Sequence, residues 1–295
     1  MDTIINVRHL CQKYGDRTLY EDLHFSVPSG KIFGLLGKNG VGKTTLIKIL
    51  MGFLRPVSGK CSVFGEDSHA LSPATRARIG LLFEGHLAYD FMTIEQIEQF
   101  YGPHYARWNR DVYYDLVDRL GLSHSHVIKN MSCGQRSQVV LGLIFAQQPD
   151  LMILDDYSMG LDAGYRRLFL EYLREYVRDG TKTVFMTSHV ILDLEDMVDD
   201  VLFLERGGAL LQTTLKDFTS QFKCFAYPYQ QGSELPRPGG IIKNVEMFSK
   251  TVSLYSFGTR EEVSKCLAEA GITAPSLERV PMNLEDAFVG YTGTY

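Results

Sequence analysis

A glycine-rich run between two apolar segments constrains this chain more than any other feature. Residues 37–45 read Gly-Lys-Asn-Gly-Val-Gly-Lys-Thr-Thr, which matches the phosphate-loop pattern G-x-x-x-x-G-K-T. The apolar residues 31–36 predict a buried strand before the loop, and residues 45–51 predict a helix after it. In that context the glycines let backbone N–H groups converge on phosphates, and the helix N-terminus adds a favourable dipole. The chain is therefore expected to bind a nucleoside triphosphate.

Individual positions of this loop have separate expected roles. Lys43 is expected to neutralise the β- and γ-phosphates, and the Thr44 hydroxyl is expected to bind Mg²⁺. The other nucleotide-binding residues expected here are Gly37, Asn39, Gly40, Gly42 and Thr45.

A second apolar strand ends in carboxylates. Leu151-Met-Ile-Leu-Asp155 has the Walker B pattern, and Asp155 is expected to hold Mg²⁺. Between the two motifs, Met131-Ser-Cys-Gly-Gln135 precedes a predicted helix and resembles the L-S-G-G-Q signature of ATP-binding cassette (ABC) ATPases. A serine hydroxyl, small residues and a helix N-terminus make a second anion site.

Resemblance to the ABC ATPases covers residues 1 to about 215, over which the motifs keep the order and spacing of the family. It implies ATP and Mg²⁺ as ligands. It also implies that Ser132, Gly134 and Gln135 meet the ATP held by a second ATPase subunit, in a head-to-tail homodimer or heterodimer.

Further residues acquire roles through the same resemblance. Tyr14 fits the aromatic residue that stacks on adenine, an interaction worth about 1–3 kcal/mol. Ser158-Met-Gly-Leu-Asp162 fits the D-loop of the family. His189 follows a predicted strand at 182–187 and fits the switch histidine that reaches the γ-phosphate. Glu84 stands where the family usually has a Gln that ligates Mg²⁺ and senses the transporter.

Two departures from the family pattern concern carboxylates. Asp156 replaces the usual Glu that orients or activates the attacking water, and its side chain is one methylene shorter. Misplacement by about 1 Å can cost about 100-fold in rate, so we expect slow but not absent hydrolysis. An ionised Glu84 attracts Mg²⁺ but repels the γ-phosphate. As a hypothesis, Glu84 and Asp156 are coupled, and the coupling raises the pKa of one of the two carboxyl groups.

A third departure is Cys133, which stands where the signature usually has Gly. Cys is strained there if the backbone needs a positive φ. Four consequences stay open from the sequence: weaker dimer closure, a non-identical second subunit, a redox-active thiolate, or a tolerated small residue.

Strands and helices alternate along the chain, which predicts an α/β fold with a largely parallel core sheet. The resemblance adds a P-loop NTPase core, an antiparallel β subdomain and a helical subdomain at about 86–148. Strands are expected at 3–10 and 19–27, and residues 93–122 are expected to be mainly helical with a break near Gly102-Pro103. The ATPase domain is expected to span residues 1–222.

Residues 223–295 are expected to form a small C-terminal α+β module. Residues 227–240 are rich in Pro and Gly and predict a loop. Alternating apolar residues at 245–257 predict a hairpin after this loop. A capping box at Thr259–Glu262 and an N-cap at Asn283 predict two helices that follow the hairpin. Residues 283–293 resemble the closing segment of daunorubicin-resistance-type exporter ATPases.

Bulk composition places the chain in the cytoplasm. Its net charge of -5 argues against nucleic-acid binding, and its five scattered cysteines fit a reducing compartment. The N-terminus does not resemble a signal peptide. Residues 139–146 form an apolar run much shorter than the roughly 20 residues that span a bilayer.

We therefore expect the ATPase subunit of an ABC exporter, peripheral on the inner face of the cell membrane and coupled to a separate integral-membrane permease. The alternative is a weakly hydrolysing ATP switch that holds a membrane-associated complex together without transport. Asp156 and Cys133 favour that alternative modestly.

Overall fold

A computed structural model describes residues 2–83, 89–158, 160–188, 190–272, 274 and 276–293. The chain divides into two compact units. The first comprises Met1–Val190 and Met197–Gln212, and the second comprises Ile191–Asp196 and Thr213–Tyr295. The α-helix α7 (Leu215–Gln221) belongs to the second unit. The domain limit expected at residue 222 stays a prediction.

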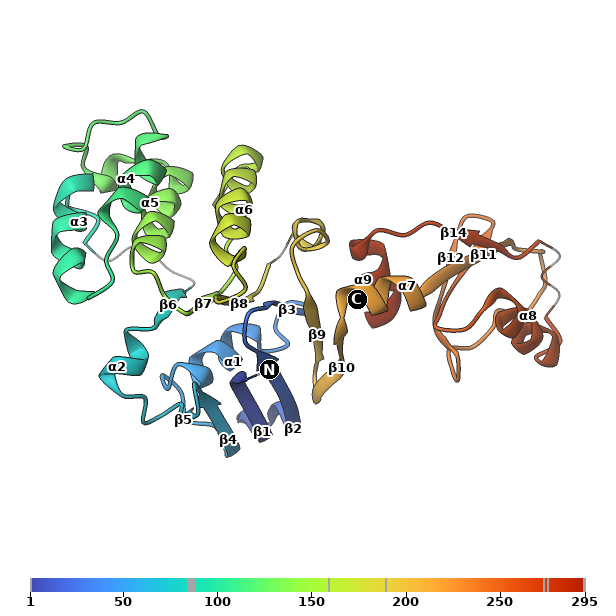
Figure 1. The fold of residues 1–295 in the computed structure, drawn as a ribbon. Helices are drawn as coiled ribbons and strands as arrows, with labels where there is room; N and C mark the ends of the chain where they lie inside the picture. The colour runs from blue at the N-terminus through green and yellow to red at the C-terminus, as the bar shows by residue number, and fades with distance from the viewer. Residues whose placement is uncertain are drawn as a thin grey trace. The chain divides into compact units, whose positions relative to one another are not determined.

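The centre of the first unit is a six-stranded sheet with the order β10-β9-β3-β8-β7-β6 (Figure 1). Its strands are β3 (Ile32–Gly37), β6 (Ile79–Leu82), β7 (Leu151–Leu154), β8 (Thr183–Met186), β9 (Asp200–Glu205) and β10 (Gly208–Thr214). β3 pairs in parallel with β8 and β9, and β7 pairs in parallel with β6 and β8. These strands are short and almost wholly apolar, as expected for a parallel sheet buried on both faces. The predicted α/β fold is confirmed.

A second sheet of the first unit is antiparallel, with the order β2-β1-β4-β5. It contains β1 (Thr3–Tyr14), β2 (Arg17–Pro28), β4 (Ser58–Val63) and β5 (Glu66–Asp67). β1 and β2 are longer than the predicted strands, and the ladder continues to the pair Tyr14 and Arg17 beside the turn. The extension places both residues at the tip of a continuous hairpin.

Three phenylalanines join the two sheets. Phe25 from β2 stacks on Phe33 from β3 and on Phe185 from β8, with ring centroids 6.2 Å apart in each pair. Phe33 and Phe185 stack with centroids 5.8 Å apart. All three rings are buried in one apolar cluster, and offset stacking at this spacing adds about 0.5–1.5 kcal/mol per pair beyond area burial. The hairpin is thereby attached to the parallel sheet.

Helices of the first unit are α1 (Lys43–Leu50), α2 (Pro73–Arg76), α3 (Ile94–Tyr101), α4 (Arg110–Asp118), α5 (Cys133–Ala146) and α6 (Ala163–Val177). Two 3₁₀ turns, η1 (Gly102–His104) and η2 (Ile128–Asn130), lie among them. η1 interrupts the helical region at the Gly102-Pro103 break that the sequence predicts. α3, α4 and α5 pack around a separate apolar core centred on Tyr113 and Val139. In the described ranges, no helix combines the length and apolar composition needed to cross a bilayer.

The second unit is an α+β module with its own apolar core. Its sheet has the order β12-β13-β11-β14, formed by β11 (Lys223–Pro228), β12 (Ile242–Phe248), β13 (Thr251–Ser256) and β14 (Glu278–Val280). Its helices are α7, α8 (Arg260–Glu269), α9 (Leu284–Thr292) and the 3₁₀ turn η3 (Ile191–Leu194). The hairpin and both helix caps match the sequence prediction. α7, β11 and β14 were not predicted.

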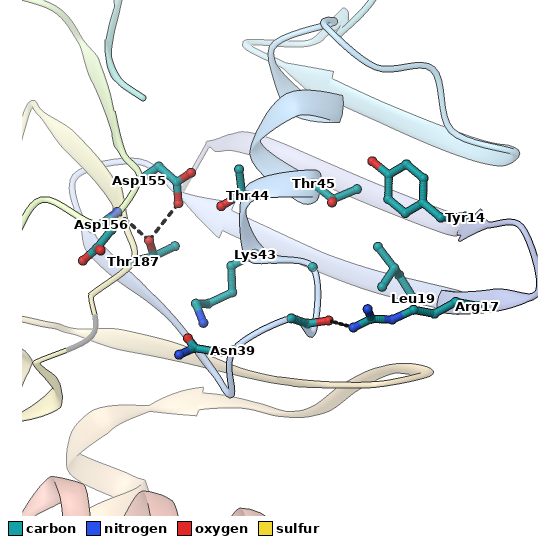
Figure 2. Close-up of a pocket in the computed structure, with 12 residues that line it drawn as sticks. Tyr14, Arg17, Leu19, Asn39, Lys43, Thr44, Thr45, Asp155, Asp156 and Thr187 are labelled. Carbon is teal, nitrogen blue, oxygen red and sulfur yellow. Dashed lines mark hydrogen bonds between the residues drawn. The ribbon is translucent and has the colours of Figure 1, made fainter. Parts of the chain in front are cut away.

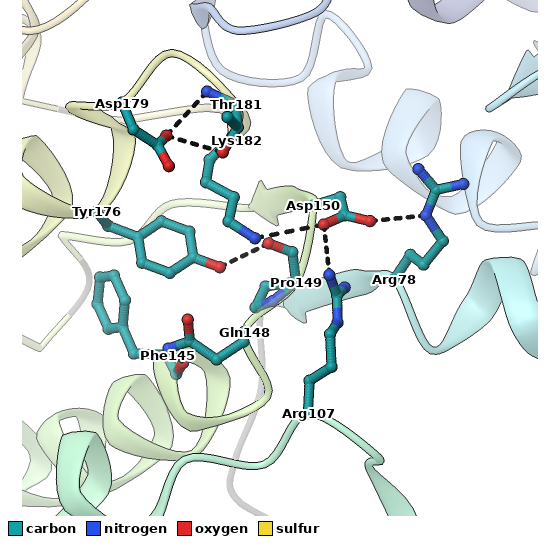
Figure 3. A network of polar contacts seen from close by, with 10 residues as sticks. All are labelled: Arg78, Arg107, Phe145, Gln148, Pro149, Asp150, Tyr176, Asp179, Thr181 and Lys182. Atoms are coloured by element: carbon teal, nitrogen blue, oxygen red, sulfur yellow. Dashed lines mark hydrogen bonds and ion pairs between the residues drawn. The ribbon is translucent and has the colours of Figure 1, made fainter.

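An ion-pair network centred on Asp150 connects the helical region to the parallel sheet (Figure 3). Its carboxylate contacts Arg78 Nε at 2.7 Å, Arg107 Nη1 at 2.8 Å and Lys182 Nζ at 3.3 Å. Burial alone raises the pKa of Asp150, but the hydrogen bonds from Arg107 and Arg78 outweigh it and lower the pKa to about 2. Residues from three segments distant in sequence therefore depend on one ionised carboxylate.

We predict that Asp150→Asn lowers the free energy of unfolding by about 1–2 kcal/mol at pH 7, since the network is partly exposed. The folded-state pKa lies below the unfolded value, so this stability is present above about pH 4 and is lost as the pH falls toward 2. The difference in unfolding free energy between the variant and the wild type should therefore shrink between pH 4 and pH 2. Urea unfolding, followed by the fluorescence of Trp108, the only tryptophan in the sequence, measures it. Exposed Asp16→Asn is the control. A difference independent of pH would contradict the ion-pair account.

Candidate functional site

Residues 37–45 connect β3 to α1, which is the context that a phosphate loop requires. Gly42 is the N-cap of α1 and has a φ of 111°, a conformation open to glycine but rarely to other residues. The Tyr20 hydroxyl, from β2, donates to the Gly42 carbonyl, and a Cβ at Gly42 would overlap the Tyr20 ring. Tyr20 therefore positions the loop from the neighbouring sheet, a role that the sequence did not reveal.

Lys43 is held against the loop that precedes it. Its ammonium donates to the Gly37 carbonyl at 2.6 Å and to the Lys38 carbonyl at 3.2 Å. Burial lowers the pKa of Lys43, and the negative charges of Asp155 and Asp156 act in the opposite direction. The lysine of the phosphate-loop motif is thus half-buried and lies within the electrostatic influence of both carboxylates.

The carboxylates follow β7 and are organised by a threonine from the next strand. Thr187 Oγ1 donates to Asp155 Oδ1 at 3.0 Å and accepts the Asp156 N–H at 2.8 Å (Figure 2). Asp155 is 3% exposed. Thr187 follows β8, which pairs in parallel with β7, so both groups emerge at the same edge of the sheet. The sequence did not assign this role to Thr187.

Asp156 has a left-handed backbone, with a φ of 48°. Asp and Asn adopt this conformation several times more often than other non-glycine residues. Its Oδ1 accepts a hydrogen bond from Ser158 Oγ at 3.0 Å. The short carboxylate is therefore fixed by both its backbone and a neighbouring hydroxyl.

One wall of the site comes from the β1–β2 hairpin. Tyr14 is 50% exposed at the end of β1 and lines the pocket. Arg17, the first residue of β2, donates from Nη2 to the Gly40 carbonyl of the loop. Leu19 lines the pocket beside them. Arg17 and Leu19 were not predicted, because nothing in a local pattern shows that the hairpin tip reaches the loop.

These elements enclose a pocket of about 620 Å³ (Figure 2). Its lining residues are Tyr14, Arg17, Leu19, Asn39, Gly40, Gly42, Lys43, Thr44, Thr45, Asp155, Asp156 and Thr187. Every sequence-predicted loop residue except Gly37 lies in this lining, and Gly37 contacts Lys43 through its carbonyl. The structure thus brings together the phosphate loop, both carboxylates and the aromatic residue.

The signature residues lie outside this lining and form the start of α5. Ser132 Oγ accepts the Gln135 N–H at 3.3 Å, and Gln135 Oε1 accepts the Ser132 N–H at 2.9 Å. The first turn of a helix leaves N–H groups without intrahelical partners, here those of Cys133 and Gly134. Cys133 is exposed and helical, so the backbone strain considered for it does not arise.

Two predicted catalytic residues, Glu84 and His189, lie outside the described residues. The expected coupling of Glu84 to Asp156 and the contact of His189 with a γ-phosphate therefore stay predictions.

Comparison with known proteins points to the same family as the sequence motifs. Residues 20–158 match a family model described as ABC transporter. The chain is 29% identical over 303 residues to the Nod factor export ATP-binding protein I of Cupriavidus pinatubonensis, covering 99% of this chain and 92% of that protein. It is 30% identical over 225 residues to the probable multidrug ABC transporter ATP-binding protein YbhF of Escherichia coli, and the match covers 75% of this chain and 39% of that protein.

Solved structures share the fold. An ATP-binding subunit of an ABC transporter superposes with a TM-score of 0.65 at 24% identity, covering 74% of this chain and 92% of that chain. A bacterial Atm1-family ABC exporter with ATP bound superposes with a TM-score of 0.63 at 21% identity, and the match covers 74% of this chain and 40% of that chain. Each likeness extends over about three quarters of this chain and concerns its fold.

We predict that Thr187→Val weakens Mg²⁺-dependent ATP binding by about tenfold or more, because loss of a group that orients a metal ligand typically costs 10–100-fold. Thr187→Ser keeps the hydroxyl and is the matched control. Titration with a fluorescent ATP analogue in Mg²⁺ and again in EDTA isolates the effect, which should disappear without the metal. Equal affinities of Thr187→Val and wild type in Mg²⁺ would show that the bridge does not serve the metal site.

Proposed function

The chain belongs to the ABC transporter family of ATP-binding proteins, and from that premise we propose that it hydrolyses ATP to power a membrane exporter. The observation that carries the proposal is one pocket that combines the phosphate loop, Asp155, Asp156 and Tyr14. The phosphate loop follows β3 and both carboxylates follow β7 of the parallel sheet, whereas Tyr14 ends β1 of the antiparallel sheet. A chance glycine turn does not assemble such a set.

ATP binding in this proposal uses the two sheets together. Lys43 and the N–H groups of the loop hold the β- and γ-phosphates, as cations and helix N-termini do. The exposed ring of Tyr14 stacks on adenine. Arg17 ties the hairpin tip to the loop through Gly40, so the aromatic wall keeps its distance from the phosphate site.

Mg²⁺ fits the oxygen donors at the centre of the pocket. The Thr44 hydroxyl and the Asp155 carboxylate are hard oxygen ligands of the kind that Mg²⁺ prefers, and both line the pocket. When bound, the ion neutralises charge that develops on the phosphates. Thr187 orients Asp155, and Glu84 is proposed as a further ligand.

Hydrolysis requires a group that positions water against the γ-phosphate. We assign this role to Asp156, whose carboxylate lines the pocket next to Lys43 and Thr187. His189 is proposed to contact the γ-phosphate from the segment that follows β8. The hydrogen bond from Ser158 orients the Asp156 side chain but uses one lone pair, which is consistent with slow turnover.

A second ATPase subunit is proposed to complete the site. Ser132, Gly134 and Gln135 stand at the exposed start of α5 and do not contribute to the pocket of their own chain. The N–H groups of the first helical turn suit a phosphate presented by another subunit. ATP then bridges two subunits head to tail, and loss of the γ-phosphate releases them. Homodimer and heterodimer both satisfy this arrangement.

Transport is proposed from the relatives and from one exposed surface. The similar proteins are named for Nod factor export and as a probable multidrug transporter component. Tyr89, Phe91 and Phe100 expose their rings together beside α3, with the Tyr89 and Phe100 centroids 4.9 Å apart. Such an aromatic surface suits a short helix of a separate permease. We place the chain on the cytoplasmic face of the cell membrane on this basis.

The second candidate function is an ATP switch that assembles a membrane complex without transport. The restrained, short carboxylate of Asp156 favours it, because slow hydrolysis prolongs the ATP-bound dimer. Turnover in the presence of the permease separates the two candidates.

We predict that Asp156→Asn reduces ATP turnover by about 10²–10⁴-fold, the usual contribution of a general base, and leaves ATP binding intact. Asn tolerates the left-handed backbone and keeps an acceptor for Ser158, so the loop conformation should survive. Single-turnover hydrolysis and equilibrium ATP binding, measured on the same preparations, test this. Wild-type turnover in Asp156→Asn would remove the residue from the mechanism.

We also predict that Asp156→Asn forms dimers with ATP and Mg²⁺ in sedimentation velocity. Adding Cys133→Glu should abolish them, because its charge suits the N-terminus of its own helix but repels the facing phosphate. Cys133→Gln has nearly the same size without the charge and should dimerise at least in part. Equal dimerisation of the Glu and Gln variants would contradict the proposed contact.

A further inference from the structure

Three metal-binding side chains meet on the β1–β2 hairpin, outside the nucleotide pocket. His9 Nδ1 in β1 lies 3.0 Å from Asp22 Oδ1 in β2, and His24 Nε2 lies 2.9 Å from the same oxygen. The three potential ligand atoms all lie within 4.8 Å of one another. Among the residues that the structure describes, no other group of three His, Cys, Asp or Glu side chains is so arranged.

A backbone irregularity brings His9 to this position. The β1–β2 register shifts between Val7 and Leu10, and His9 between them has a left-handed φ of 50°. A bulge of this kind re-aims one side chain relative to a regular ladder. Asp22 and His24 are two residues apart on β2 and therefore share a face. The bulge thus directs His9 toward Asp22 and His24, which β2 presents on one face.

The neighbouring strand makes room for this bulge. Gly59, in β4, has a φ of 96°, and a Cβ there would overlap the His9 carbonyl. A side chain at that position is excluded by both its conformation and the close approach. The bulge is therefore accommodated by the sheet on both sides of β1.

The ligand types and the two nitrogen–oxygen distances fit a transition-metal ion. Two imidazoles and a carboxylate are ligands of Zn²⁺ and similar divalent ions, at about 2.0–2.2 Å from the metal. Two such ligands at angles between square and tetrahedral lie about 2.9–3.5 Å apart, and both nitrogen–oxygen distances match the lower limit.

We propose that His9, Asp22 and His24 bind one divalent transition-metal ion of the Zn²⁺ class, with water in the remaining positions. The side chains of these residues are 76%, 65% and 43% exposed, so the ion can enter from solvent and keep water ligands. Binding through His24 Nε2 places the ring proton on Nδ1. Each ligating nitrogen gives up its proton, so the ion takes the place of the two hydrogen bonds to Asp22 Oδ1. The long 3.4 Å contact of His24 Nδ1 with the His9 N–H is lost as well.

A bound ion would link the bulge of β1 to β2 within the hairpin whose tip carries Tyr14 and Arg17. The proposal rests on these three side chains alone and does not depend on ATP hydrolysis or transport.

The test titrates metal-stripped, full-length protein with Co²⁺, whose visible absorption reports its ligands, and then displaces it with Zn²⁺. Excess Mg²⁺ occupies the nucleotide-site oxygens. We expect one Co²⁺ per chain. His9→Gly removes a ligand at a backbone conformation that glycine favours, so the variant should fold at least as well without metal. Its affinity should fall about tenfold or more.

His104→Ala, in η1, is the matched control and should bind like wild type. Zn²⁺ should raise the melting temperature of wild type and control but not of His9→Gly. Binding that is absent, or equal in wild type and a His9→Gly, His24→Ala double variant, would overturn the site and leave ordinary surface His–Asp pairs. ATP affinity measured on the same samples is expected to be unchanged, which separates this test from that of the proposed function.

Discussion

Parallel pairing of β3, β7 and β8 is the constraint on which the site depends. Strands that run in the same direction end at the same edge, so the phosphate loop, Asp155 with Asp156, and Thr187 emerge side by side although they are separated by more than a hundred residues at the extremes. The apolar side chains of these strands are buried and fix their pairing. Polar groups that would be costly in the interior are thereby confined to the one edge where a ligand can reach them.

The antiparallel sheet contributes to the same site through packing and not through sequence proximity to a motif. Phe25, Phe33 and Phe185 attach the hairpin to the parallel sheet. Tyr20 and Arg17 then contact carbonyls of the phosphate loop. The three stacked phenylalanine pairs and these two hydrogen bonds therefore hold the hairpin that carries Tyr14 beside the pocket. An exposed aromatic residue at a hairpin tip would otherwise have no reason to be rigid.

Asp156 and Cys133 depart from the family pattern in physically different ways. Asp156 combines a shorter side chain with a left-handed backbone that Asp tolerates, and hydroxyls of Thr187 and Ser158 hold its backbone and carboxylate. Its geometry is therefore organised and not accidental. Cys133 is the first residue of the regular helix α5, which Ser132 caps, and it is exposed. The change to Asp156 affects the proposed rate of ATP hydrolysis. The change to Cys133 affects which phosphate-bearing partner the exposed start of α5 can accept.

The sequence alone determined the phosphate loop, the Walker B strand, the signature helix, the break at Gly102-Pro103 and the caps at Thr259 and Asn283, because each depends on neighbours within a few residues. It missed β11, whose final Pro228 reads locally as loop but pairs with Thr251 at the end of its ladder. It also missed Arg17, Tyr20 and Thr187 as parts of the site, and the His9 bulge beside Asp22 and His24. Only the tertiary structure decided these, since each depends on a contact between strands whose register no local pattern encodes.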